Sequence, residues 1–202
     1  MTKLFVRDPA EASRRVLGMG WPVNVSVIMI VLAGIISGVM WAVDQALFGA
    51  APQPMLLPDG REVMVAPATP LTVGVFSAII GVVFSYLIYW VGVRSGGRGS
   101  LPGVMAVMAA LQIALTVLGV ISGFLGIALP LLGFGLALAL IYVSMRGYAH
   151  AVQQAHGFDT MGRSVMVMIA ALFLAVFVLL ILSMFLLPVL MPEMLVEVEN
   201  AL

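Results

Sequence analysis

Cysteine is absent from the 202-residue chain, and charged residues make up only 9% of it. Without cysteine the chain has no disulfide, no thiolate nucleophile and no cysteine-bound metal. A soluble domain is about a quarter charged, whereas this chain is 63% hydrophobic and has too few polar side chains to cover a surface in water. The composition therefore excludes an ordinary soluble domain and predicts a protein whose surface faces lipid.

The chain contains several long apolar runs. A bilayer core about 30 Å thick needs roughly 20 apolar helical residues, and five runs meet or approach that length, at about 23–47, 71–93, 101–120, 127–146 and 164–187. The third and fourth runs share an uncharged stretch that is interrupted near 121–130 by Gly123, Gly126 and Pro130. The pattern leaves open whether this break is a loop or a helix kink.

These runs predict an all-α, polytopic membrane helical bundle with five transmembrane helices at 22–188. A cytoplasmic N-terminal amphipathic segment at 1–21 precedes it, and an exported tail at 189–202 follows. Five spans place on one side Lys3, Arg7, Arg14, Arg15, Arg94, Arg98, Arg146 and Arg163, and leave only Arg61 on the other. Because basic loops stay in the cytoplasm, we expect an inner-membrane protein with a cytoplasmic N-terminus and a periplasmic C-terminus. A four-span alternative, with 101–145 as a re-entrant hairpin, would separate these arginines.

Two segments outside the spans have recognisable signals. Pro9 after Asp8 predicts a short helix with proline in its first turn. That helix is either interfacial or, as we favour, a basic flank that sets topology. The exported segment 52–67 carries a Pro-Asp-Gly turn signal between two short apolar runs, and a hairpin there is left open.

No pattern in the chain predicts catalysis. No Ser–His–Asp arrangement, carboxylate pair or cofactor motif is present. His150 and His156 are six residues apart, which on a helix is a rotation of about 600°, and no third metal ligand accompanies them. We expect both to be interfacial residues without a metal role, near the end of a fourth helix that continues to about Ala155 and is capped by Gly157. Asp44, near the exported end of the first span, is expected to face water or headgroups. We therefore expect no enzyme, no catalytic residue, no cofactor and no metal.

The stretch VRSGGRGSLPG, residues 93–103, raises the question of phosphate binding. It is not a Walker loop, because no Gly-Lys-Ser/Thr follows the glycines. Ser100 is a good cap for the next helix, and Arg94, Arg98 and Ser100 are candidate contacts for a lipid phosphate at that helix N-terminus. A turn that only sets topology is the favoured alternative. Gly34 and Gly38 form a GxxxG pattern that is expected to serve helix packing within the chain.

Three pieces of the sequence resemble one family. GGRGSLPGVMAVMAALQIAL (96–115) and HGFDTMGRSVMVMI (156–169) resemble the starts of the third and last spans in the Yip-domain family of multi-pass membrane proteins. DPAEASRRVL (8–17) is similar to its bacterial members. The resemblance implies a five-span, non-enzymatic membrane protein. The DLxGP-type motif of the eukaryotic members is absent, so their role with Rab GTPases and vesicle traffic is not carried over.

The expected function is to organise or assist a membrane protein and lipid assembly without catalysis. The expected partners are the lipid bilayer and other membrane proteins or a second copy of the chain, and no nucleic acid. One alternative is a small transporter or permease component, which predicts a polar cavity reached by Asp44 and Gln112. Another is an accessory subunit of a respiratory or photosynthetic membrane complex.

Overall fold

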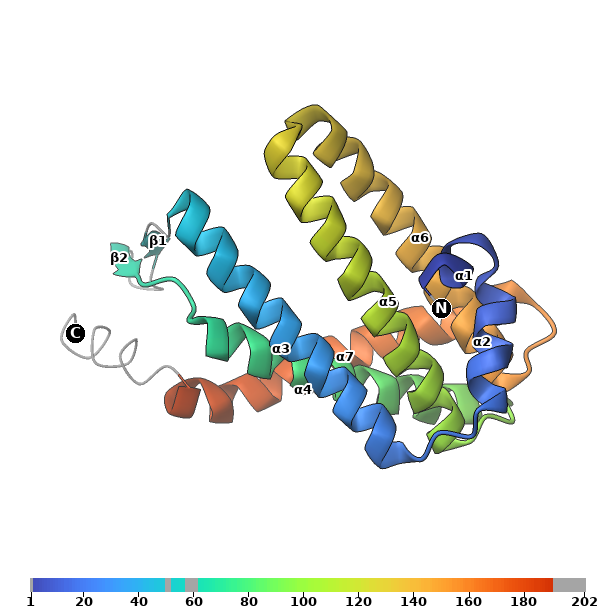
Figure 1. Ribbon diagram of the computed structural model, residues 1–202. Coiled ribbons are helices and arrows are strands. Elements are labelled where there is room, and N and C mark those ends of the chain that lie inside the picture. The colour runs from blue at the N-terminus through green and yellow to red at the C-terminus, as the bar shows by residue number, and fades with distance from the viewer. Residues whose placement is uncertain (1, 50–51, 57–61, 191–202) are drawn as a thin grey trace.

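The computed structural model describes residues 2–49, 52–56 and 62–190. Its helices are α1 (Thr2–Arg7), α2 (Pro9–Gly18), α3 (Val23–Phe48), α4 (Pro70–Arg94), α5 (Leu101–Ala128), α6 (Pro130–His156) and α7 (Met161–Leu190). The last five are each long and apolar enough to cross a membrane, and they form a helical bundle (Figure 1). The prediction of an all-α bundle with five membrane-spanning helices is therefore confirmed.

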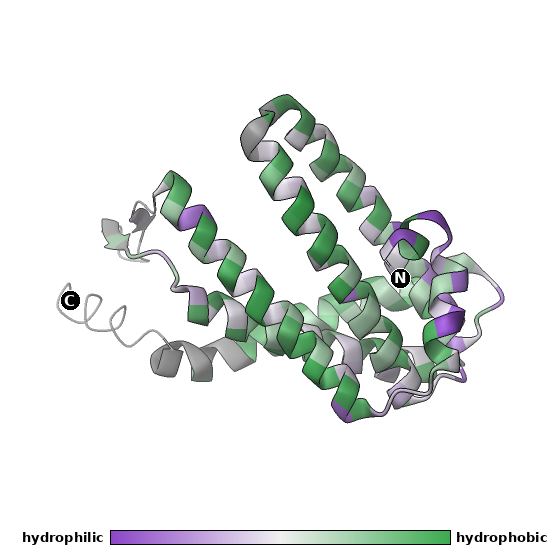
Figure 2. Ribbon diagram, in the orientation of Figure 1, coloured by the Kyte–Doolittle hydropathy of each residue, from purple (hydrophilic) through white to green (hydrophobic). Residues whose placement is uncertain are grey.

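Hydrophilic residues gather at one end of the bundle, which we call the arginine-rich end (Figure 2). Helices α1 and α2 lie there, together with the turn between α4 and α5 and the turn between α6 and α7 (Figure 1). The two turns touch, because the amide of Arg98 donates to the carbonyl of His156 at 2.9 Å. Arg98 and Arg163 of α7 thus share an end, as five spans require, and α5 and α6 are each long and apolar enough to cross the membrane.

The break between the third and fourth spans lies within the predicted stretch 121–130, near its end. Helix α5 continues past the predicted span end at 120 to Ala128, α6 starts at Pro130, and only Leu129 separates them. In lipid no water replaces a lost backbone hydrogen bond, so Gly123 and Gly126 do not end the helix. Pro130 does, because it has no amide hydrogen, and Leu129 before it is extended (φ −141°, ψ 84°). The break is a tight reversal between antiparallel helices. Helix α6 runs on beyond the predicted span end at 146 to His156, in agreement with the expected extension of this helix to about Ala155.

A small hairpin lies outside the bundle. Strand β1 (Gln53–Leu56) pairs antiparallel with β2 (Glu62–Val65), with Gln53 opposite Val65 and Leu56 opposite Glu62. The segment 52–67 therefore does contain a hairpin. The turn signal at 58–60 lies outside the described residues, and so does the tail from 191 to 202.

The core is concentrated near the arginine-rich end, where it includes the N-terminal helices. Phe5, Ala12 and Val16 are buried in the same cluster as Val107 of α5 and Val152 of α6. The interfacial alternative for this segment is thus contradicted, because the apolar side of the amphipathic α2 faces protein. Helix α2 begins as predicted at Pro9, capped by Asp8, and α1 before it was not expected.

Candidate functional site

Two turns build the centre of the arginine-rich end. The first joins α4 to α5 and needs a left-handed residue at Gly96 (φ 85°). It ends at Ser100, whose Oγ accepts a hydrogen bond from the amide of Gly103 at 3.3 Å and so caps α5. The second turn begins at Gly157, which is also left-handed (φ 65°) and closes α6. Both caps agree with the roles that the sequence predicted for these residues.

The side chain of His156 fills the space between the two turns. It is 1% exposed, and it stacks on Phe158 with ring centroids 5.3 Å apart. A Cβ added at Gly92 would collide with its imidazole, and one at Gly97 would lie 2.7 Å from its Nδ1. The glycines of this turn therefore leave room for a histidine ring. Neither ring nitrogen has a hydrogen-bond partner among the described residues.

This placement corrects the interpretation of His156 as an interfacial residue. The sequence separates His156 from Gly92 and Gly97 by a whole helical hairpin, so only the fold shows that they meet. The three glycines after α4, at 96, 97 and 99, are more than a simple turn requires. Their number could have indicated that a bulky side chain packs against this turn. Among the described parts of the chain, no group of three potential metal ligands comes together.

The three predicted phosphate contacts are all exposed but differ in availability. The guanidinium of Arg94 lies over the ring of Trp90, 3.8 Å from its centroid, in a cation–π contact. Ser100 uses its Oγ as the cap of α5. Arg98 makes its contact with His156 through the backbone, and its side chain has no ion pair with the described residues. Arg98 is thus the most available cation of the turn.

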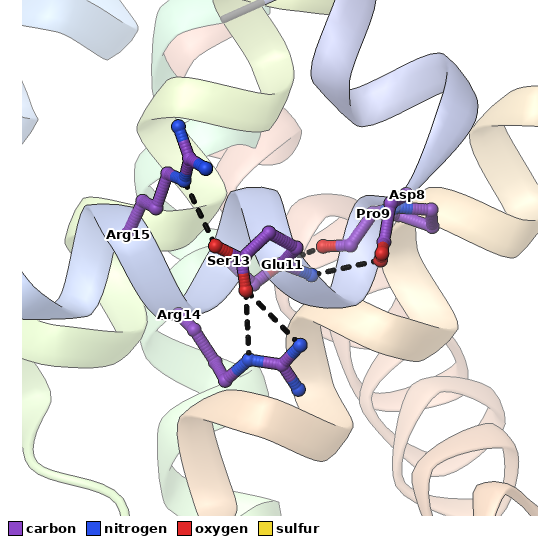
Figure 3. A network of polar contacts seen from close by, with 6 residues as sticks. All are labelled: Asp8, Pro9, Glu11, Ser13, Arg14 and Arg15. Carbon is purple, nitrogen blue, oxygen red and sulfur yellow. Dashed lines mark hydrogen bonds and ion pairs between the residues drawn. The ribbon is translucent and has the colours of Figure 1, made fainter.

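Part of the positive charge on α2 is neutralised locally (Figure 3). Glu11 accepts from Arg14 Nη2 at 3.1 Å and from Arg15 Nε at 2.9 Å. These two guanidinium groups, Arg15 first, hold the pKa of Glu11 below its usual value of 4.5. The amide of Glu11 in turn donates to Asp8 at 2.9 Å. The N-terminal helices therefore form an internally paired unit, docked on the bundle.

A cleft opens between α3 and α5 away from the arginine-rich end. The two helices pack where Ile30 meets Met105 and Ala109, and they then separate (Figure 1). The cleft has a volume of about 640 Å³ and is lined by Ser37, Met40, Trp41, Val43, Asp44, Leu47, Phe48, Val73, Gly123, Phe124 and Gly126. Asp44 is the one charged residue among the described residues of this lining.

Asp44 has no partner in the cleft that would neutralise it. The two nearby donors, Trp41 Nε1 and Gln45 Nε2, both donate to the carbonyl of Ala68, at 2.8 and 3.1 Å. Within the described residues, Asp44 takes part in no salt bridge. Gln112 is not near it, because its amide group lies against Gly81. The structure therefore does not bring together the polar pair that a transporter was expected to use.

A second cleft lies on the other side of α5, toward α6. Its volume is about 870 Å³, and its lining includes Gly119, Gly123, Gly126, Gly133 and Ala137. Gly123 and Gly126 thus line both clefts. The predicted packing glycines lie elsewhere, between α3 and α4: a Cβ on Gly34 would be 2.7 Å from the carbonyl oxygen of Gly74, and one on Gly38 would be 2.5 Å from that of Pro70.

The family follows from a comparison with known protein families. The model of the Yip1 domain matches residues 3–182, which include α1, α2 and most of the five-helix bundle. The chain belongs to the Yip1 domain family. The Yip1 domain is that of a membrane protein family, so the resemblance seen in the sequence is confirmed. Among curated proteins and among solved structures, none matches the chain.

Proposed function

We propose that this Yip1-domain chain is a non-catalytic membrane protein that organises lipid and protein neighbours. The observation that supports this most is the pair of apolar clefts on either side of α5. Lipid tails are as apolar as the helices, so no hydrophobic force closes such a cleft within the membrane. Helix α6 also leaves most of its span uncovered, with 6% of its most apolar window buried. These surfaces are available to neighbours in the membrane plane.

The proposed location is the cytoplasmic, inner membrane, with the arginine-rich end in the cytoplasm and the C-terminus outside. Lys3, Arg7, Arg98 and Arg163 have no ion pair among the described residues. Such cations are attracted by anionic headgroups. Arg94, Arg98 and Ser100 are proposed to contact a lipid phosphate, with Arg98 as the principal contact for the reason given above.

Crosslinking in native membranes, followed by purification in mild detergent, tests the organising function. We expect a partner protein or a second copy of the chain to copurify in a fixed ratio. Gly123→Leu, which places a side chain where both clefts meet, should lower that ratio. Gly162→Leu is the matched control, because Gly162 lines neither cleft and a Cβ there meets nothing within 4 Å. A monomer that crosslinks to no protein would contradict the proposal.

A transporter component is the second candidate, and the place of Asp44 in a cleft favours it. Its test is solute flux in proteoliposomes that contain the purified chain. If solute flux depends on the chain and is lost in the Asp44→Asn variant, the proposed function is transport and not organisation of membrane neighbours. The absence of flux with a range of ions and small solutes would leave the organising function in place.

A further inference from the structure

We propose that the cleft between α3 and α5 binds one bilayer lipid whose headgroup carries a primary amine, with Asp44 as the partner of the ammonium group. This inference rests on the proposed function, because it names one neighbour that the chain would hold. It is argued from the charge of Asp44, from the width of the cleft and from the nature of its walls.

No cation among the described residues compensates the charge of Asp44. The residue lies close to the end of α3 at Phe48, where the carbonyl groups give the helix a partial negative charge that disfavours an anion. No described cation pairs with it, and its lining neighbours are mostly apolar. A carboxylate beside hydrocarbon is costly unless a cation accompanies it. An external cation at this position would relieve both effects.

A primary ammonium group matches Asp44 better than other lipid headgroups. It carries N–H donors and can form a charge-assisted hydrogen bond with the carboxylate. A trimethylammonium group has the same charge but no donor. A headgroup with only phosphate and hydroxyl groups has a net negative charge, which the carboxylate repels. The site therefore predicts that lipids with a primary ammonium group bind more tightly than lipids with a trimethylammonium group or with a net negative headgroup.

The width of the cleft suits an acyl chain and is too small for a helix. The Cε atom of Met40 on α3 lies 4.0 Å from the position of a Cβ on Gly123 of α5. One unbranched methionine side chain thus fills the gap at this level, and an acyl chain would take its place when the flexible side chain of Met40 turns aside. A helix with its side chains is about 10–12 Å across, whereas an acyl chain is unbranched and about as thin as the methionine side chain itself.

The walls of the cleft are consistent with an acyl chain. Leu47, Phe48 and Phe124 supply large apolar side chains, and Gly123 and Gly126 leave the surface of α5 bare. A lipid with its amine at Asp44 would lay a chain along this surface toward the middle of the bilayer. Apolar walls with a few placed polar groups are typical of sites for small ligands.

Native mass spectrometry of the purified full chain tests the inference. The chain is equilibrated with equal amounts of palmitoyl-oleoyl phosphatidylethanolamine, phosphatidylcholine and phosphatidylglycerol, then released from the detergent. We expect one retained phosphatidylethanolamine per chain, favoured about tenfold over each of the others, the ratio that one charge-assisted hydrogen bond would give. Asp44→Asn should remove the preference, and Gly123→Leu should lower the retention of all three lipids.

Two matched controls accompany these variants. Asp159→Asn removes an exposed carboxylate in the turn between α6 and α7, and Gly162→Leu adds a side chain in open space outside the clefts. Both should retain phosphatidylethanolamine as the wild type does. Asp44→Asn keeps the size of the side chain and breaks no salt bridge among the described residues, so it decides the question even if Gly123→Leu does not fold.

Three results would overturn the inference. They are equal retention of the three lipids by the wild type, an unchanged preference in Asp44→Asn, and a dimer that retains no lipid, which would show that a second copy fills the cleft. The experiment uses defined lipids and no protein partner. Its failure therefore leaves the crosslinking result untouched, and a failed crosslinking experiment leaves the lipid preference intact.

Discussion

At the level of single residues, His156 shows why the turn between α4 and α5 is so rich in glycine. Its ring occupies the space that side chains at Gly92, Gly97 and Gly99 would need. The buried ring therefore joins two turns that are far apart in the sequence. The contact is steric, because neither ring nitrogen has a hydrogen-bond partner among the described residues.

Gly92→Ala is expected to destabilise the chain because the new methyl group collides with the buried imidazole of His156. Overpacking of this kind costs about 1–3 kcal/mol. The double variant Gly92→Ala with His156→Ala should recover part of that loss, because the smaller side chain makes room. Thermal unfolding in detergent measures both. Gly162→Ala, in open space, is the control and should not destabilise, and an equally harmless Gly92→Ala would contradict the described packing.

Glu11 makes the stability of the N-terminal helices depend on pH. Its pKa in the folded chain is lowered by Arg15 and Arg14 below 4.5, so its contribution is complete above that value and is lost as the pH falls through the folded pKa. Wild type should exceed Glu11→Gln in unfolding temperature at neutral pH, by a small margin because the pair is exposed. The margin should shrink in acid, and a margin that is independent of pH would contradict this.

At the level of helices, close packing depends on positions where two backbones meet. Gly34 and Gly38 of α3 lie against Gly74 and Pro70 of α4, and Gly126 lies against Gly133 across the reversal between α5 and α6. In a membrane, small residues of this kind let helices approach and gain dispersion contacts. The GxxxG pattern of α3 thus contacts a helix of the same chain.

Gly38→Ala should weaken the pairing of α3 and α4. The added Cβ would lie 2.5 Å from the carbonyl oxygen of Pro70, and backbone cannot move aside as a flexible side chain can. We expect a loss of about 1–3 kcal/mol in the free energy of unfolding, measured by thermal unfolding in detergent. Gly135→Ala, on the open surface of α6, should instead be neutral or stabilising, since alanine favours helix. Equal stability of Gly38→Ala and wild type would refute the close approach.

At the level of the whole molecule, the five helices alternate in direction and bring the N-terminal helices and two turns to one end (Figure 1). That end carries most of the basic residues, and the hairpin of β1 and β2 lies at the other end with the finish of α3. The arrangement accounts for the charge pattern with five crossings. It also places the cleft between α3 and α5 away from the arginine-rich end.

Single-cysteine labelling can test this arrangement without background, because the chain has no cysteine of its own. Ser95→Cys and Thr160→Cys lie in the two turns of the arginine-rich end, and Pro52→Cys precedes β1. A membrane-impermeant thiol reagent applied outside intact cells should modify only the cysteine at position 52. Modification of the cysteines at 95 and 160 from opposite sides would contradict five spans. A reporter that is active only in the periplasm should be active when it is fused to Leu202, and a reporter that is active only in the cytoplasm should not.

Much of the fold could be predicted from the sequence because the information is local. The apolar runs predict the spans through their length alone, and Asp8, Ser100 and Gly157 predict helix ends through chemistry within a few residues. The break at Leu129 lies within the predicted stretch 121–130, but its exact place was not predicted, because Gly123 and Gly126 weaken a helix in water and are tolerated in lipid, where every backbone group must stay paired. The resemblance to the family was likewise contained in short segments.

The sequence by itself determined that this protein is a membrane protein, that it has five spans, and which of its turns are basic. These properties depend on the length of the apolar runs and on the positions of the charges, and not on contacts between helices. Only the tertiary structure decided that His156 meets Gly92, that α2 docks on the bundle and that Asp44 stands unpaired in a cleft. These are contacts, or missing contacts, between residues on different helices. In a membrane the apolar surfaces of all helices look alike, so their pairing depends on shape complementarity that no single segment contains.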